Sequence, residues 1–295
     1  MSRRRIDVFV LQLDGTLARE GTLFPHVDAA LETFGRFGTH GGERPKIGLV
    51  HDSGTLDEDA SAGEIREELK ALGLARFFRR PSKQVVVSGS RLPDREAFAD
   101  WLGGLGGDFD RALLLTGQRS CVRRCGRYGM AALRFARSSR AERDFGDWSE
   151  APLVVAWRFF PEDQANVKMA LQLFLEVRHG AELVSFDPPT PTGPLTLVAK
   201  TWQPLTSKRL GKLSGVHVRL PVQMRLEMQG TPRAVISAPD HDALEDVEQF
   251  VCALREHGVI QEVKGNGRLS PSVTHVVEED SSGRRLLVRR RFSSR

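Results

Sequence analysis

The residue types with the most obvious chemistry lie near the start of the chain, at the ends of two apolar runs. Residues 6–11 are apolar apart from Asp7, and they lead through Gln12 into a tight turn that contains Asp14. A carboxylate such as that of Asp14 can transfer a proton, whereas the neutral amide of Gln12 is neither a nucleophile nor an anionic ligand. The trio 51–53 (His-Asp-Ser) follows a second apolar run. These neighbours cannot form a catalytic triad with one another. Either His51 or Ser53 contacts a ligand at the strand end, or the trio lies in a solvated loop.

The first of these segments resembles the first motif of the haloacid dehalogenase (HAD) superfamily. In that motif a strand leads into Asp-x-Asp-Gly-Thr, and here the corresponding residues are Gln12, Asp14, Gly15 and Thr16. The resemblance implies that the first Asp attacks a phosphoryl group and that the second acts as general acid and base. Gln12 therefore stands in the place of the nucleophile, and only Asp14 is kept. The motif that indicates the fold thus argues against the usual reaction.

The later HAD motifs show further substitutions. His51 takes the place of the phosphoryl-binding hydroxyl residue, with Ser53 two positions late, and Arg91 is the cation nearest to the expected Lys. The two positions that hold the metal carboxylates in the family fall on Gly117 and Cys121. Neither residue offers a hard side-chain oxygen to Mg²⁺. The resemblance therefore implies a degenerate, pseudoenzyme-like catalytic set and a relict pocket formed by Asp14, His51, Ser53 and Arg91.

The elements that must position these residues follow the order of the HAD family over residues 5–136. Apolar periodicity and turn residues predict helices and strands in alternation. The expected helices cover 62–72, 94–105 and a segment ending at 127, and the expected strands cover 84–88, 111–115 and 131–135. The spacing from the first motif to the second leaves no room for a large folded insert. We therefore expect a capless, HAD-like Rossmannoid α/β domain over residues 1–138.

A second domain is expected after a polar, aperiodic linker at 139–150. Residues 151–295 predict an α+β domain, of no family that we recognise, with two helices against a mostly antiparallel sheet. The expected strands cover 153–159, 181–186, 195–202, 216–228, 233–237 and 259–263, the helices cover 162–178 and 241–257, and a hairpin pairs 273–278 with 285–292.

Composition describes an ordinary globular protein. The chain has 295 residues, of which 27% are charged and 40% hydrophobic, and no run of 18 apolar residues predicts a membrane helix. The apolar run at the N-terminus reads as a core strand and not as a signal peptide. Three cysteines do not make a disulfide framework, and Cys121 and Cys125 lack partners at zinc spacing. These features favour a cytoplasmic protein without a cofactor, and the high arginine and glycine content suggests a bacterial source.

Positive charge is concentrated at the C-terminus. The formal net charge is +5, and Arg289, Arg290 and Arg291 lie together near the end of the chain. They predict a basic strip that binds an acidic macromolecule, either protein or nucleic acid. The alternative is an edge strand that uses cations against aggregation, with acidic residues at 278–280 neutralising part of the strip.

Three functional hypotheses remain open from the sequence. The preferred one is a binding, regulatory or assembly role, with a protein partner or through self-association and without a membrane. The second is a divergent phosphate-ester hydrolase that uses Asp14 and His51, which would require Mg²⁺. The third places an unrecognised activity in residues 151–295.

Overall fold

The computed structural model describes residues 6–39, 43–52, 55–57, 60–88, 92–137, 143–188, 194–228, 232–236, 241–263 and 269–290. The chain forms two compact units. The first comprises residues 1–174, 188–194 and 227–233, and the second comprises 175–187, 195–226 and 234–295. The main division falls inside helix α7 (Gln164–His179) and not at the predicted linker, 139–150.

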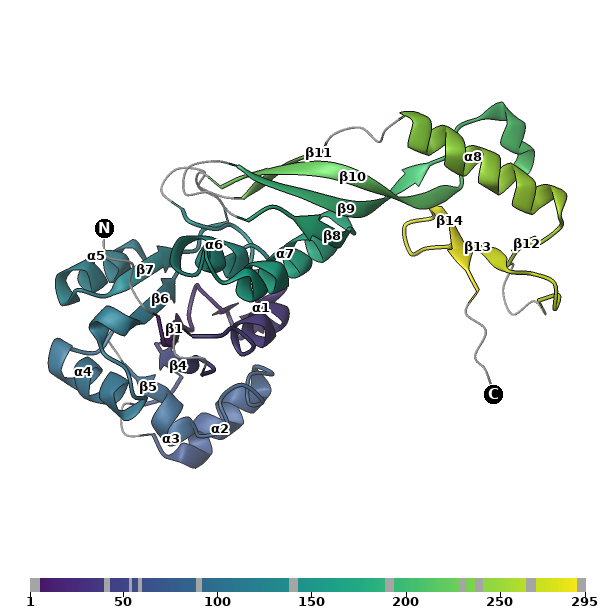
Figure 1. The fold of residues 1–295 in the computed structure, drawn as a ribbon. Coiled ribbons are helices and arrows are strands. Elements are labelled where there is room, and N and C mark those ends of the chain that lie inside the picture. Colours follow the sequence, from purple (N-terminus) through teal and green to yellow (C-terminus); the bar gives the residue numbers. More distant parts are fainter. Residues whose placement is uncertain are drawn as a thin grey trace. The chain divides into compact units, whose positions relative to one another are not determined.

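The first unit is built on a parallel five-stranded sheet, as expected for a Rossmannoid domain (Figure 1). The order is β5 (Val85–Val87), β4 (Lys46–His51), β1 (Val8–Gln12), β6 (Ala112–Thr116) and β7 (Ala131–Arg134). All four neighbouring pairs run parallel. The carboxyl ends of β1, β4 and β6 therefore meet at one edge of the sheet.

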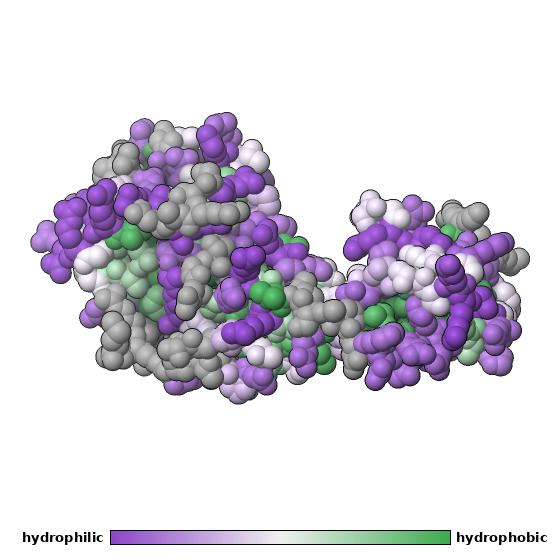
Figure 2. Space-filling view, turned by 90° about the horizontal axis from the view of Figure 1, so that it is seen from above, coloured by the Kyte–Doolittle hydropathy of each residue, from purple (hydrophilic) through white to green (hydrophobic). Residues whose placement is uncertain are grey.

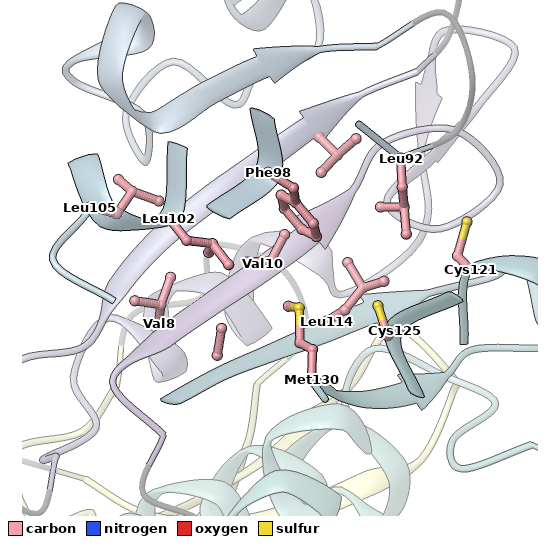
Figure 3. Close-up of a cluster of buried hydrophobic side chains, with 12 residues drawn as sticks. Val8, Val10, Leu92, Phe98, Leu102, Leu105, Leu114, Cys121, Cys125 and Met130 are labelled. Carbon is pink, nitrogen blue, oxygen red and sulfur yellow. The ribbon is translucent and has the colours of Figure 1, made fainter. Parts of the chain in front are cut away.

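One face of this sheet is covered by α4 (Arg95–Gly104) and α5 (Arg119–Tyr128). Alternate residues of β1, Val8 and Val10, point into a buried cluster with Phe98 and Leu102 of α4 and Cys125 of α5 (Figure 3). Both helices were predicted, because their boundaries carry clear signals. The Asp94 carboxylate accepts a hydrogen bond from Ala97 N at 2.9 Å as an N-cap, and Gly129 ends α5 with a φ of 82°.

The opposite face is covered by α1 (Val27–Phe34) and α6 (Ala151–Phe159). Phe9 of β1 lies in an aromatic cluster with Phe34, Phe37 and Phe160, with ring centroids 4.9, 6.2 and 6.4 Å away. The expected strand at 153–159 was wrong, because this segment is α6. Its residues 153–156 are all buried, and a short, continuously apolar run fits a buried strand or a buried helix equally well.

The stretches around β1 and β7 complete the first unit. Between β1 and β4 the described residues form only the hairpin β2 (Ala18–Arg19)–β3 (Thr22–Leu23) and α1. The helices α2 (Ala62–Ala71) and α3 (Pro81–Gln84) follow β4, and the short η1 (Phe109–Arg111) precedes β6. The described part of the predicted linker is packed into this unit. Phe145 and Trp148 are fully buried, with ring centroids 5.3 Å apart. The polar composition of 139–150 concealed these two aromatic anchors.

The second unit contains a mixed sheet in the order β12 (Ile260–Glu262), β13 (His275–Glu279), β14 (Arg285–Arg289), β10 (His217–Glu227), β9 (Leu195–Pro204) and β8 (Glu182–Phe186), with β11 (Arg233–Ile236) paired to β10. The pairs β8–β9, β9–β10 and β13–β14 are antiparallel, so the predicted C-terminal hairpin is confirmed. However, β12–β13 and β10–β14 are parallel. The expectation of a mostly antiparallel sheet is corrected to a mixed one, because turn residues identify hairpins but not the pairing of strands across long connections.

Helix α8 (His241–Glu256) packs against η2 (Lys208–Leu213) in the second unit. The core there joins Leu210 and Leu213 of η2, Val218 of β10, Val251 of α8 and Val277 of β13. Hydrophilic residues make up most of the visible surface in Figure 2, with hydrophobic residues in smaller groups. No helix in the described ranges is both long and apolar enough to cross a membrane.

Candidate functional site

The residues of the expected catalytic motifs come together at the carboxyl edge of the parallel sheet. Gln12 ends β1, His51 ends β4, and Gly117 directly follows β6. Asp14 is exposed in the turn after β1, and Thr16 is buried beneath it. Ser53 and Arg91 lie outside the described residues, so their assignment to a relict pocket stays a prediction.

Gln12 is fully buried, and both ends of its amide are held by neighbouring side chains. Its Nε2 donates a hydrogen bond to Asp52 Oδ2 at 2.6 Å and a weaker one to Cys121 Sγ at 3.6 Å. Its Oε1 accepts a hydrogen bond from the Thr116 hydroxyl. The side chain in the position of the family's nucleophile is therefore a structural crosslink between β1, β4 and β6.

Asp52 is the centre of this network, although the sequence did not single it out. Besides Gln12, its carboxylate accepts a hydrogen bond from Asp14 N at 2.9 Å and one from Gln118 Nε2 at 3.1 Å. Burial raises the pKa of Asp52 above its usual range, and the bonds from Asp14 N and Gln12 oppose that shift. The available signal was an Asp directly after a buried strand, but its partners come from segments far apart in the sequence.

Gly117 occupies the first expected metal position, and the space beside it is filled by backbone. Its N–H donates to Thr16 Oγ1 at 2.6 Å. A Cβ at Gly117 would clash with Gly15 O. The turn that blocks this space is held in place by Trp148, whose Nε1 donates a hydrogen bond to Thr16 O at 2.8 Å. A carboxylate at position 117 therefore requires the turn to move.

Cys121, the second expected metal position, is a buried thiol. Desolvation by burial is the main cause that raises its pKa. Its Sγ lies 3.6 Å from Gln118 Oε1. Since the thiolate is the form that binds metals, this environment disfavours a ligand role for Cys121.

His51 is also fully buried, and burial is the main cause that lowers its pKa, partly offset by Glu68. Its Nε2 lies 3.8 Å from Glu68 Oε1 of α2. The neutral imidazole is thus favoured at physiological pH. His51 packs within the edge of the sheet and does not offer its ring to solvent.

These residues do not fit the Mg²⁺ ion that the resemblance implies. At the expected ligand positions stand an amide whose N–H groups face Asp52 and Cys121, a glycine with no room for a side chain, and a buried thiol. The nearby carboxylates are those of Asp14 and Asp52, and Asp52 already accepts three hydrogen bonds. Hard divalent cations need oxygen ligands that are free to coordinate.

The predicted basic strip is partly engaged within the second unit. Arg285 pairs with Glu262 at 2.5 Å, and Arg284 pairs with Asp280 at 2.8 Å. Arg290 donates to Ser270 O at 3.4 Å, while Arg289 is exposed. Arg291 lies outside the described residues.

Comparisons with known proteins found no family model and no curated protein that matches the chain. One similar solved structure is a conserved haloacid dehalogenase-like protein of unknown function from Agrobacterium tumefaciens, with 15% identity and a TM-score of 0.29, over 40% of this chain and 47% of that one. Another is a putative beta-phosphoglucomutase from Thermotoga maritima, with 21% identity and a TM-score of 0.28, over 40% of this chain and 49% of that one. The alignments span about half the length of each structure.

The architecture of the first unit itself agrees with the sequence motifs. Its parallel sheet carries the Asp-Gly-Thr turn directly after the central strand β1. The neighbouring strands β4 and β6 bring the second and fourth motif positions to the same edge. The N-terminal region is therefore HAD-like in fold.

Proposed function

We propose that the HAD-like region does not catalyse phosphoryl transfer and that the protein acts by binding, in a regulatory or assembly role with a protein partner or a second copy of itself. The proposal combines the altered motif residues with the way their side chains are used. Gln12, Thr116 and Gln118 are committed to hydrogen bonds within the chain. Polar groups that satisfy one another in this way stabilise a fold and are not available to a substrate.

The observation that carries the proposal is the position of the Asp52 carboxylate. It accepts hydrogen bonds from three of the donors at this edge, which are Gln12 Nε2, Asp14 N and Gln118 Nε2. A phosphoryl group arriving here would meet the negatively charged Asp52 side chain. The donors that could bind the phosphoryl oxygens already donate to Asp52. Like charges at contact distance repel more strongly in a partly buried site than in water.

The alternative, a hydrolase that uses Asp14 and His51, has less support. A general base must come within hydrogen-bond reach of the proton that it takes. Asp14 is exposed and therefore accessible to a substrate, but His51 is fully buried. Glu68 of α2 lies 3.8 Å from the ring, so substrate access on that side would require α2 to move.

We also propose that the basic strip binds an acidic macromolecular partner. It now rests mainly on Arg289, whose side chain is exposed at the end of β14. Arg284 and Arg285 contribute less, because each is paired with a carboxylate of the same unit. Binding through exposed arginines should weaken as salt is raised.

A hydrolysis assay tests the main proposal. Purified protein with Mg²⁺ should not hydrolyse p-nitrophenyl phosphate above the level of an Asp14→Asn variant prepared in parallel. Gln12→Asp should also be inactive, because Gly117 and Cys121 still provide no metal ligand. Mg²⁺-dependent turnover by the unaltered protein that is lost in Asp14→Asn would contradict the proposal.

A further inference from the structure

A basic pocket lies at the amino-terminal edge of the same parallel sheet, opposite the edge that carries the motif residues. Its volume is about 660 Å³, and its lining includes Lys46 at the start of β4, the segment 77–84 through α3, and the end of α4 with the glycine-rich turn after it. Along β4, Lys46 and His51 are separated by roughly 16 Å at about 3.3 Å per residue. The pocket is therefore separate from the Asp52 network, and it lies wholly within the first unit.

Charge distinguishes this pocket from the rest of the edge. The cations that line it are Lys46, Arg79, Arg80 and Lys83, and none of the described lining residues is acidic. All four side chains are exposed, and none of them forms an ion pair with a carboxylate in the described part of the chain. Four cations around one concavity, with no acidic residue in its described lining, form a field that attracts anions.

The cation-bearing segment is fixed by Gln84. Its Oε1 accepts a hydrogen bond from Arg80 N at 2.8 Å. Its Nε2 donates to Ile47 O of β4 at 3.2 Å and to Phe77 O at 3.5 Å. One side chain therefore ties the loop before α3 to the sheet, which lowers the cost of ordering the arginines around a ligand.

The remaining wall of the pocket is apolar. Ile47 and Leu105 are buried beneath it, and Phe77 is half-buried at its side. A guanidinium group, that of Arg76, lies 4.7 Å from the centroid of the Phe77 ring. The pocket thus presents cations on one side and an apolar surface on the other, where Arg76 covers one face of the Phe77 ring. Its volume is typical of small-molecule sites.

From this arrangement we propose that the pocket binds a nucleoside polyphosphate, with the phosphates against Lys46, Arg79, Arg80 and Lys83 and the base against the wall formed by Ile47, Phe77 and Leu105. Arginine grips phosphate oxygens bidentately, and lysine adds a point charge. The proposal does not depend on the loss of phosphoryl transfer at the other edge. It gives the first unit a ligand-binding site that lies away from its motif residues.

Calorimetric titration of the full chain with pyrophosphate and with ATP at low ionic strength tests this inference. Both should bind, and ATP should bind more tightly because it also contacts the apolar wall. The double variant Arg80→Gln/Lys83→Gln should bind both ligands about tenfold more weakly or worse, since it loses two charge-assisted contacts. The double variant Arg66→Gln/Arg123→Gln is the matched control, because it removes the same charge from exposed positions on α2 and α5.

A second variant tests the contact with the nucleoside separately from the contacts with the phosphates. Phe77→Leu should weaken ATP binding and leave pyrophosphate binding unchanged, with thermal unfolding used to confirm that the fold is kept. The proposal is overturned if neither ligand binds, or if the pocket variant and the control variant bind equally well. It is also overturned if pyrophosphate binds as tightly as ATP, because the apolar wall would then take no part.

Discussion

The two edges of the parallel sheet in the first unit use polar side chains in opposite ways. At the carboxyl edge, Asp52, Gln12 and Gln118 satisfy one another, and the Gly15 carbonyl fills the space beside Gly117. At the amino edge, Lys46, Arg79, Arg80 and Lys83 surround an open pocket whose described lining contains no acidic residue. The motif residues show where the reaction takes place in the family that the sequence resembles. In the described part of this chain, charges that are not paired with carboxylates lie at the other edge, and that is where we expect a ligand to bind.

The largest effect is expected from the anchor behind the carboxyl edge. Trp148→Ala removes a fully buried indole and its hydrogen bond to Thr16 O. It should lower the free energy of unfolding by about 3–5 kcal/mol, as for other buried aromatic truncations. Urea denaturation measures this change. Phe250→Ala is the control, because Phe250 is 54% exposed, and equal losses in the two variants would contradict a closed, packed edge.

A smaller loss is expected from a side chain at the blocked metal position. Gly117→Ala places a Cβ against Gly15 O, and the resulting strain should cost about 1–3 kcal/mol. Gly126→Ala in α5 is the matched control, because no atom beyond its neighbours and the backbone of its own helix lies within 4 Å of the added Cβ. That variant should be stabilised by up to about 1 kcal/mol, since alanine favours a helix over glycine. If Gly117→Ala left the free energy of unfolding unchanged, the turn that contains Gly15 would be able to move at little cost.

The raised pKa of Asp52 predicts a pH dependence of stability. The folded protein binds a proton at Asp52 more readily than the unfolded chain does, because the pKa of this carboxyl group is near 3.8 when the chain is unfolded. Relative to Asp52→Asn, the unaltered protein should therefore gain stability as pH falls through the raised folded pKa, and lose that gain as pH rises through it. Denaturation of both proteins in urea at a series of pH values measures the difference. A difference that is flat, or that grows with pH, would contradict the burial of this carboxylate.

The smallest effect is expected in the basic strip of the second unit. Arg289→Ser should leave the thermal midpoint unchanged, because the side chain is exposed. Arg285→Ser should lower the midpoint more, since Arg285 pairs with Glu262 and donates to Lys212 O at 2.9 Å. A larger effect at Arg289 would show that the exposed cation is structural and does not serve a partner.

Local signals in the sequence predicted much of the fold but little of the site. The helices α2 and α4 were predictable because Ser61 with Glu64 forms a capping box and Asp94 caps its helix. Segment 153–159 was mistaken for a strand, because its apolar run carries no period that separates strand from buried helix. The roles of Asp52 and Gln84 depend on partners 38 and 37 residues away in the chain. Such contacts arise from the sheet order, which a single sequence does not encode locally.

The contrast between the two edges can be tested most directly by following backbone amide NMR signals of the full chain during a titration with pyrophosphate. The account predicts that the signals that move belong to residues 46, 47, 77, 79, 80, 83, 84 and 103–106, which line the basic pocket. Signals of residues 12–16 and 116–118 should stay in place, because the donors at that edge are already bound to Asp52. Shifts confined to 12–16 and 116–118 would contradict the account and return the motif edge to the role of a phosphate site.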